Sequence, residues 1–273
     1  MSSVRSILEG FKKMGATAMV NLTPTLARNR DRFTVDVQTN AKKEQRFIIN
    51  ASPSFELQVL DVNPKDRHLV LMVKETRPAT RKHSPPVVTT HKFLCGHDER
   101  HWFVAAVPGG SVHDVVTAKE ALQPREVREK ASAKIAKPSK RFTRNNEVFK
   151  RQGEWFFVPT TIDKIDTLKV RFNEPMVRPG GGKPHIAEKA YRVGGTSVYV
   201  RGNETITPEE YFKLDKKSSM YSMWRPMVAN PKLYVSGKIS HPDHKTIDLK
   251  GWYLVLVNTE SEAASKKHML FLD

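Results

Sequence analysis

The sequence predicts an α+β protein that is rich in strands. Three observations lead to this prediction. Short apolar–polar alternations recur along most of the chain, turn-forming residues separate them, and few segments show helical spacing. In order, we expect an N-terminal antiparallel meander and then a mixed β-sheet region that carries a basic helical insertion. The 273 residues suffice for a sizeable core in one large domain or two small ones.

The first third of the chain, residues 1–80, is expected to be a small antiparallel β region that follows a short helix. The stretch "SVRSILEGFKKMG" has the spacing of a short amphipathic helix. "RFTVDVQ" then alternates between apolar and polar residues from Phe33 to Val37, which is typical of a half-buried strand. Further strands are expected in "QRFIIN", "FELQVLDV" and "RHLVLMVKE", the last two separated by the turn-forming "NPKD".

A proline-rich stretch follows this meander. Residues 76–90 hold three prolines and lack periodicity, so we place a linker at 81–90. Residues 91–273 are then expected to form a second, β-rich domain. It should begin with strands in "HKFLCG" and "HWFVAAVP".

The segment 117–151 is predicted to be a basic helical insertion. Thr117 and Glu120 have the spacing of a capping box, so a helix should begin there, and Pro124 should restart it. The segment holds 11 Lys or Arg residues against 4 Asp or Glu, and its apolar residues are few. Much of it should therefore be exposed.

The remainder of the chain returns to strands. Candidates are "EWFFVP", "TLKVRF", "TSVYVRG", "KLYVSGKI", "KTIDL" and "WYLVLVN". One helix should interrupt them, with Thr207 as N-cap, Pro208 at its first position and Glu210 closing the capping box. The glycine-rich residues 178–184 predict a flexible loop, and His185 and Glu188 could begin a helix after it.

The charge of the chain indicates the class of partner. A formal net charge of +17 favours a polyanion, with nucleic acid first and RNA ahead of DNA. A membrane is not expected, because no apolar run approaches the roughly 20 residues that a spanning helix needs. A single cysteine excludes an intramolecular disulfide framework, and with no visible secretory signal it favours the cytoplasm.

Lysine and arginine side chains of the basic segment and of the glycine-rich loop should neutralise phosphates. The predicted nucleic-acid-binding residues are Lys134, Lys137, Lys140, Arg141, Arg144, Lys150, Arg151 and Lys183.

The stretch "FLCGHDERHWF" at 93–103 is the first of two candidate chemical sites. Cys95 beside His97 is the minimum for a nucleophilic pair, although cysteine is often buried without any chemistry. His97 and His101 have the spacing of zinc ligands, but on a strand residues four apart lie about 13 Å from each other. They could share a metal only if the segment is a tight turn or one turn of helix. A polar turn between two strands is the alternative.

The stretch "SHPDHKTIDLKGW" at 240–252 is the second candidate. It reads as the tip of a hairpin, so His241 and His244 could converge on one metal or one phosphate. A plain polar turn is again the alternative. The predicted catalytic residues are His97, His101, His185, His241 and His244. The predicted metal ligands are His241 and His244, for a divalent metal if any cofactor is used.

Three functions are consistent with this sequence. The first is a nucleic-acid-binding protein, chiefly for RNA. The second is a phosphodiesterase or nuclease that uses histidine acid–base or single-metal catalysis. The third is a structural component of a ribonucleoprotein or phage assembly, in which exposed strand edges would allow self-association into a homo-oligomer. The sequence leaves open whether the chain is an enzyme.

Overall fold

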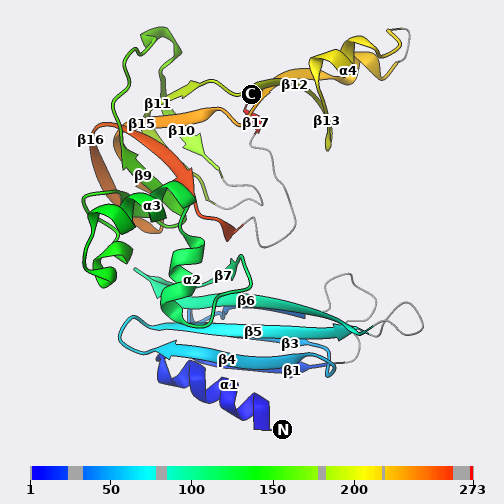
Figure 1. The fold of residues 1–273 in the computed structure, drawn as a ribbon, viewed down its shortest axis with the longest axis vertical. Coiled ribbons are helices and arrows are strands. Elements are labelled where there is room, and N and C mark those ends of the chain that lie inside the picture. Colours follow the sequence, from blue (N-terminus) through cyan, green and yellow to red (C-terminus); the bar gives the residue numbers. More distant parts are fainter. Residues whose placement is uncertain are drawn as a thin grey trace. The chain divides into compact units, whose positions relative to one another are not determined.

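The computed structural model describes residues 2–23, 33–77, 85–177, 183–216, 219–260 and 271–272 (Figure 1). Strands account for 50% of the structure and helices for 19%, so the prediction of a strand-rich α+β class is confirmed. Contacts divide the chain into two compact units. The first unit is Met1–Phe142 with Asn258–Lys266, and the second unit is Thr143–Val257 with Lys267–Asp273.

The first unit contains two sheets and most of the helical residues. Its elements are α1 (Ser2–Lys13), β1 (Ala18–Leu22), β2 (Phe33–Thr39), β3 (Gln45–Ala51), β4 (Glu56–Asn63), β5 (His68–Arg77), β6 (Val87–Asp98), β7 (His101–Val107), α2 (Val115–Leu122), α3 (Arg125–Lys134) and the 3-10 helix η2 (Pro138–Phe142). One sheet has the order β1-β3-β2, and the other is the antiparallel meander β4-β5-β6-β7.

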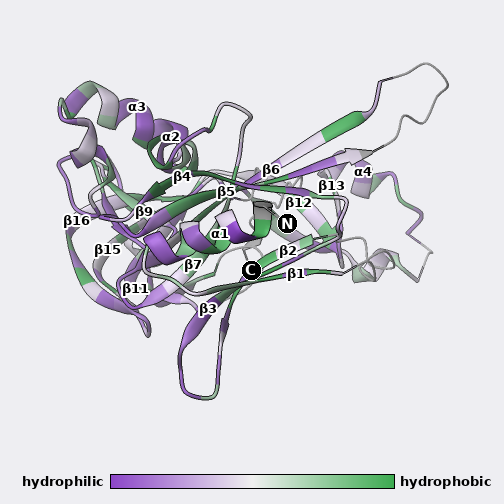
Figure 2. Ribbon diagram, turned by 90° about the horizontal axis from the view of Figure 1, so that it is seen from below, coloured by the Kyte–Doolittle hydropathy of each residue, from purple (hydrophilic) through white to green (hydrophobic). Residues whose placement is uncertain are grey.

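Helix α1 forms because its apolar residues recur with helical spacing. Ile7 and Phe11 are four positions apart and share one face, and both are buried. The opposite face is polar, and Figure 2 shows both hydrophilic and hydrophobic residues on this helix. The buried face packs into a core with residues of both sheets, including Phe47 and Leu71. The ring centroids of Phe11 and Phe47 are 4.8 Å apart.

The meander β4–β7 buries both of its faces. On β5, Leu69, Leu71 and Val73 belong to the core that contains α1, whereas Val70 belongs to a separate core that contains α2. Because side chains on a strand alternate between faces, a sheet covered on both sides needs a continuous apolar run. The run "LVLMV" in this strand meets that requirement.

Helix α2 begins earlier than its sequence suggests. Asp114 is the N-cap: its side chain accepts a hydrogen bond from the backbone N–H of Thr117, 2.7 Å away. The prediction that Thr117 caps the helix is wrong, because Thr117 is the third residue of the helix, and its Oγ1 accepts a hydrogen bond from the backbone N–H of Asp114. Pro124 does separate α2 from α3, as expected.

The proline-rich stretch after β5 does not separate two compact units. Strands β5 and β6 on either side of it are hydrogen-bonded neighbours, from Arg77 opposite Val87 to His68 opposite Gly96. Residues 81–84 of the predicted linker lie outside the described residues. The contacts instead divide the chain after residue 142, within the basic segment 117–151.

The second unit is built on a six-stranded sheet and a smaller one. Its elements are β8 (Lys150–Gln152), β9 (Trp155–Pro159), the 3-10 helix η3 (Thr167–Lys169), β10 (Arg171–Met176), β11 (His185–Val193), β12 (Thr196–Arg201), β13 (Glu204–Ile206), α4 (Pro208–Phe212), the 3-10 helix η4 (Tyr221–Met223), β14 (Arg225–Ala229), β15 (Lys232–His241), β16 (His244–Val257) and β17 (Phe271–Leu272). The six-stranded order is β10-β11-β15-β16-β9-β8, and the smaller order is β13-β12-β14-β17.

The six-stranded sheet is antiparallel at every junction, whereas we expected a mixed sheet here. Among the described strands, the parallel pair is β1 with β3, in the first unit. The core of the six-stranded sheet contains Phe157, Val235, Ile239 and Leu249. "KTIDL" and "WYLVLVN", expected as two strands, form the single long strand β16, in which Gly251 has a φ of +91°.

Three further expectations for this unit have different outcomes. The cap of α4 is as predicted, with Thr207 accepting from the N–H of Glu210 and Pro208 in the first position. The helix expected from His185 is wrong, because these residues form strand β11 and pair with β10 and β15. Most of the predicted loop at 178–184 lies outside the described residues.

Candidate metal centre

Three histidines meet where strands β11, β15 and β16 lie side by side (Figure 1). His241 ends β15 and His244 begins β16, and they are directly opposite across the two-residue turn Pro242-Asp243. His185 begins β11, whose next residue Ile186 is opposite Ser240 of β15. Opposed residues on neighbouring strands share a face, so this register gathers the three side chains on one face, at one end of these strands.

The three imidazole rings are stacked closely. The ring centroids of His185 and His241 are 4.2 Å apart with an interplanar angle of 26°. His244 lies 5.6 Å from His185 and 4.7 Å from His241. One nitrogen from each ring can be chosen so that all three lie within 4.8 Å of one another. Tetrahedral zinc with bonds of about 2.0–2.1 Å needs nitrogens roughly 3.3 Å apart and lone pairs directed at the ion, so the stacked rings would have to turn as well as move inward.

His185 is the most deeply placed of the three. Its side chain is 2% exposed, and neither Nδ1 nor Nε2 has a hydrogen-bond partner. Burial, together with smaller contributions from the neighbouring His241 and His244, lowers the pKa of His185 to about 3. The ring is therefore neutral at physiological pH and presents a lone pair on one nitrogen, as a metal ligand must. Each unpaired buried polar group costs about 1–3 kcal/mol.

The turn between β8 and β9 lies against these rings. Gly153, with a φ of +57°, occupies it, and a Cβ added there would be 3.2 Å from Nε2 of His244 and 3.7 Å from Nε2 of His185. The preceding Gln152 donates to the carbonyl of Lys245, 2.7 Å away, which holds the turn in place. Oε1 of Gln152 and Nε1 of Trp155 are buried without hydrogen-bond partners. Such atoms are rare in native proteins, and an ion or water often accounts for them.

His241 already has the environment of a metal ligand on one side. Its Nε2 donates to the carbonyl of Lys183, 3.2 Å away, and its Nδ1 accepts from the N–H of Asp243, 3.1 Å away. Ligating histidines commonly donate their other ring N–H to a backbone carbonyl. His241 would therefore bind through Nδ1 and release the bond from Asp243.

Charged groups surround the three rings. Lys183 is paired with the carboxylate of Asp243, at 2.8 and 2.9 Å. Burial lowers the pKa of His241, and His244 lowers it further, whereas the carboxylates of Asp243 and Glu154 act in the opposite direction. Glu154, beside Gly153 in the β8–β9 turn, thus contributes negative charge to the surroundings of this site.

Of the five predicted catalytic histidines, His97 and His101 belong to the first unit, on the β6–β7 hairpin. There His97 is opposite Trp102 and Asp98 is opposite His101, so the two histidines point to opposite faces. His97 packs edge-on against Trp102, with centroids 4.9 Å apart. Among the described residues, a potential three-ligand cluster is found at His185, His241 and His244.

Cys95 is buried in the core that faces α1. Burial raises the pKa of its thiol, which keeps the sulfur protonated and a poor nucleophile. The interpretation as a buried cysteine at a strand, rather than a member of a nucleophilic pair, therefore fits its environment.

The predicted nucleic-acid-binding residues are divided between the units. Lys134, Lys137 and Lys140 are exposed in the first unit. Arg141 is partly buried there and donates to the carbonyl of Ile135, 2.8 Å away.

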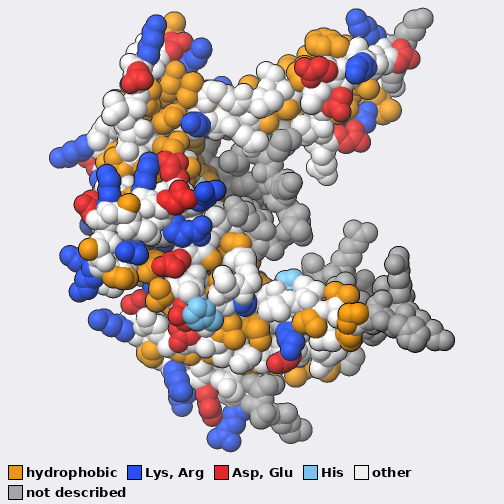
Figure 3. All heavy atoms as spheres, viewed as in Figure 1, with side chains coloured by type: hydrophobic (Ala, Val, Ile, Leu, Met, Phe, Trp, Pro, Cys, Tyr) orange, Lys and Arg blue, Asp and Glu red, His pale blue; other side chains and the backbone are white. Residues whose placement is uncertain are grey.

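The other predicted residues belong to the second unit and are partly engaged in its structure. Burial lowers the pKa of Arg144, with nearby Arg151 contributing. Lys150 donates to the carbonyl of Asp248 at 2.6 Å, and the guanidinium of Arg151 lies 6.0 Å from the ring of Phe156. On the face shown in Figure 3, Lys and Arg side chains are spread over both units and interspersed with Asp and Glu. Among the described residues on that face, the basic side chains do not form a single patch.

Sequence reasoning missed the contribution of the β8–β9 turn. The stretch "QGEWFF" predicts a strand with a turn before it, but nothing in it indicates that Gly153 contacts histidines at 185 and 244. Those contacts depend on the bend of the sheet. β9 pairs with the end of β16, while Gln152 bonds to Lys245 near its start.

Comparisons of the chain with protein-family models, curated proteins and solved structures give no match. Among the described residues, no helix combines the length and apolar content needed to cross a bilayer. Inference about function therefore depends on the chemistry of the histidine cluster.

Proposed function

We propose that the second unit binds a divalent transition metal, zinc first, through His185, His241 and His244, and uses it to hydrolyse phosphodiester bonds of nucleic acid. The observation that carries this proposal is the convergence of three imidazoles, with one nitrogen of each within 4.8 Å of the others, and one of the rings buried with both nitrogens unpaired. Water alone would have to serve both nitrogens of a buried ring, whereas a metal takes up one of them and gives the neighbouring rings a common role.

The donor set favours zinc. Three imidazoles suit Zn²⁺, Cu²⁺, Ni²⁺ and Fe²⁺, whereas Mg²⁺ and Ca²⁺ prefer oxygen ligands. A structural zinc site is usually closed by four protein ligands, and a catalytic site typically has three with one position open. Three histidines with Glu154 nearby match the second arrangement. Zinc in such a site lowers the pKa of a bound water to about 7.

The protein residues then have distinct roles. The carbonyl of Lys183 orients the ring of His241, and Gly153 leaves room for His244 and for a ligand above it. Glu154 would accept a proton from the attacking water, and Lys183 would approach a phosphate oxygen once it releases Asp243. The choice of a phosphodiester substrate follows from the net charge of +17, because Lys and Arg side chains neutralise the phosphates of nucleic acid, with RNA favoured.

The test has a binding arm and a cleavage arm. Purified protein is stripped with chelator, titrated with Zn²⁺, and its metal content and Co²⁺ absorption spectrum are measured. It is then incubated with labelled single-stranded RNA, structured RNA and duplex DNA, and the products are separated on a denaturing gel. We expect one equivalent of zinc, and shortened product only with metal.

The matched variants are His244→Ala and His113→Gln. His113 is an exposed histidine of the first unit, so its replacement also removes one histidine from the chain but leaves the cluster intact. We expect His244→Ala to lose zinc and cleavage while binding of RNA persists. Zinc binding without cleavage of any of the three nucleic acids would refute the hydrolase and leave a metal-stabilised binding protein. Absence of zinc binding would refute the proposal at its base.

A further inference from the structure

A second cluster of basic side chains lies at the opposite end of β11 from the histidines. A cavity of about 350 Å³ there is lined by Leu168, Lys169, Arg171, Ala190 and Arg192. Arg171 on β10 is opposite Ala190 on β11, and Arg192 lies two residues further along the same strand, so all three share one face. Seven positions separate Arg192 from His185, which is roughly 20 Å along a strand. The cavity is therefore distinct from the metal centre.

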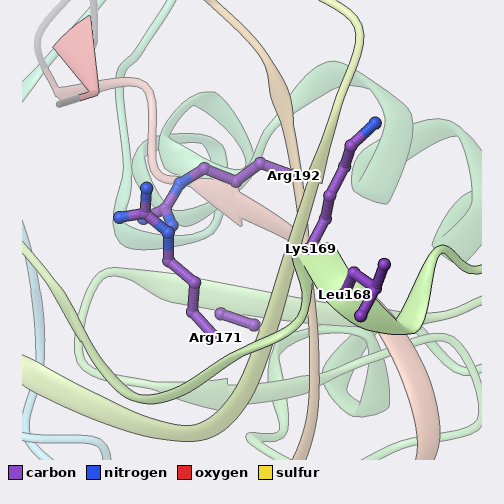
Figure 4. Close-up of a pocket in the computed structure, with 5 residues that line it drawn as sticks. Leu168, Lys169, Arg171 and Arg192 are labelled. Atoms are coloured by element: carbon purple, nitrogen blue, oxygen red, sulfur yellow. The ribbon is translucent and has the colours of Figure 1, made fainter.

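Two guanidinium groups converge on this cavity. Figure 4 shows the ends of Arg171 and Arg192 close together, while Lys169 and Leu168 extend in other directions. Like charges repel at such a separation unless an anion lies between them. One is present: Oε1 of Glu174 is 2.7 Å from Nη1 of Arg192 and 3.9 Å from Nη1 of Arg171. The same carboxylate oxygen therefore accepts a hydrogen bond from Arg192 and forms a longer ion pair with Arg171.

Arg192 has donor capacity that its surroundings do not use. Its side chain is 17% exposed, and its Nε is buried without a hydrogen-bond partner. A guanidinium offers five N–H donors in a planar arrangement that matches the oxygens of phosphate in pairs. An unpaired N–H on a buried cation is costly, so this donor is expected to have an acceptor in the working protein.

We infer that Arg171 and Arg192 form a binding site for a phosphate group. The guanidinium of Arg192 would turn in the wall of the cavity so that Nε and Nη2 donate to the phosphate, and Arg171, with a side chain 58% exposed, would close over the ligand from the rim. The volume falls in the lower part of the range for small-molecule sites and suffices for more than a bare phosphate. A phosphate of a nucleic-acid strand and a free mononucleotide share this chemistry. The site stands whether or not the histidine centre cleaves.

The experiment is a titration of the full chain in EDTA with three probes: inorganic phosphate, AMP and a labelled single-stranded RNA octamer. The ¹H–¹⁵N resonance of arginine Nε–H groups reports on the guanidinium directly, and calorimetry or anisotropy gives the dissociation constant. We expect a saturable shift of one buried Nε–H resonance with at least one probe. AMP equal to the octamer would identify a nucleotide site, and the octamer alone would identify a strand-backbone site.

Three variants separate phosphate binding from a structural role. Arg171→Gln should weaken binding at least about tenfold. Glu174→Gln, which removes the competing carboxylate, should strengthen it. Lys189→Gln is the matched control, because it removes the same charge from the neighbouring strand β11, on the face opposite that of Ala190 and Arg171. For the octamer, Arg171→Gln should also reduce the slope of log K against log salt by about 0.7 relative to Lys189→Gln.

The proposal is overturned if none of the probes binds, or if Arg171→Gln and Lys189→Gln weaken binding equally. It is also overturned if Glu174→Gln weakens binding while its unfolding midpoint matches that of the parent chain. Because Arg171 is largely exposed, Arg171→Gln is expected to fold, and its thermal unfolding is measured alongside. Loss of zinc binding in His244→Ala leaves these outcomes unchanged, so failure of one site is distinguishable from failure of the other.

Discussion

Two hairpins of this chain carry a pair of histidines around a two-residue turn, and only one of them brings the pair together. In β15–β16 the histidines are three apart, and His241 is directly opposite His244. In β6–β7 they are four apart, so His101 is opposite Asp98, and His97 is opposite Trp102. A change of one residue in spacing moves a side chain to the other face of a hairpin. Histidine content is thus a weak guide, and spacing across the turn is a stronger one.

The largest effect expected from this comparison is loss of a ligand from the converging pair. His244→Ala should lower zinc affinity by more than about 100-fold, because loss of an outer-shell partner alone typically costs 10- to 100-fold. His97→Gln, on the diverging pair, should leave zinc affinity unchanged. Competition with a fluorescent chelator measures both. Equal losses in the two variants would show that the hairpins are equivalent and the comparison mistaken.

The next effect is on stability as a function of pH. In chelator, His185 titrates near its ordinary pKa of about 6.5 in the unfolded chain but has a pKa of about 3 when folded. Between these values the unfolded chain binds one proton more, so the free energy of unfolding falls as pH falls. We expect a loss of about 2 kcal/mol between pH 7 and pH 5. The depressed pKa of His241 acts in the same direction.

Chemical denaturation at pH 7, 6 and 5 in EDTA measures this dependence. His185→Leu keeps a side chain of similar size without the titrating group, so its stability should vary less with pH than that of the parent chain. His113→Gln, at an exposed position, should vary as the parent does. If His185→Leu keeps the full dependence, the ring of His185 is already protonated or solvated in the folded chain.

A smaller effect is expected from the turn that covers the histidines. Gly153→Ala places a methyl group 3.2 Å from Nε2 of His244 and forces a side chain into a φ of +57°. Zinc affinity should fall by about tenfold, as for other changes next to a ligand, with a loss of about 1 kcal/mol in stability. Gly202→Ala is a matched control, since it also has a φ of +57° but open space around it. It should lose stability and retain zinc affinity.

The smallest expected effect is a gain of zinc affinity. Asp98→His places a histidine directly opposite His101 and so copies the register of the converging pair into the diverging hairpin. In a His244→Ala background it should restore weak zinc binding, at least about 100-fold below the parent, because β11 has no counterpart there to supply a third ligand. The same background without Asp98→His is the control. Identical affinities with and without the new histidine would mean that register alone does not create a site.

Much of this fold could be predicted from local pattern. The alternation in "RFTVDVQ", the apolar run in "RHLVLMVKE" and the cap at Thr207 each indicate the element that forms. The errors occur where contacts with distant parts of the chain determine the local structure. Thr117 and Asp114 both offer a capping oxygen, and the contact of Val115 with the sheet core selects the earlier start. His185 follows a proline in the sequence, but pairing with β15 determines a strand.

The site itself was partly visible in the sequence. The hairpin with His241 and His244 follows from its own turn residues, because Pro242 and Asp243 favour a tight reversal between two strands. That His185 is the third member depends on which strand lies beside β15, and no local pattern encodes a neighbour more than 50 residues away. Gly153 is further removed, since its contact requires the whole sheet to bend.

The unpaired imidazole of His185 has a consequence for how the protein unfolds and is degraded. A ligand that binds only the folded chain raises its apparent stability by RT ln(1 + [L]/Kd). The cluster belongs to the second unit, and the first unit has cores of its own. Zinc should therefore delay melting and proteolysis of the second unit while leaving the first at its own transition. Cells poor in zinc would then accumulate a chain that is folded at one end and open to degradation at the other.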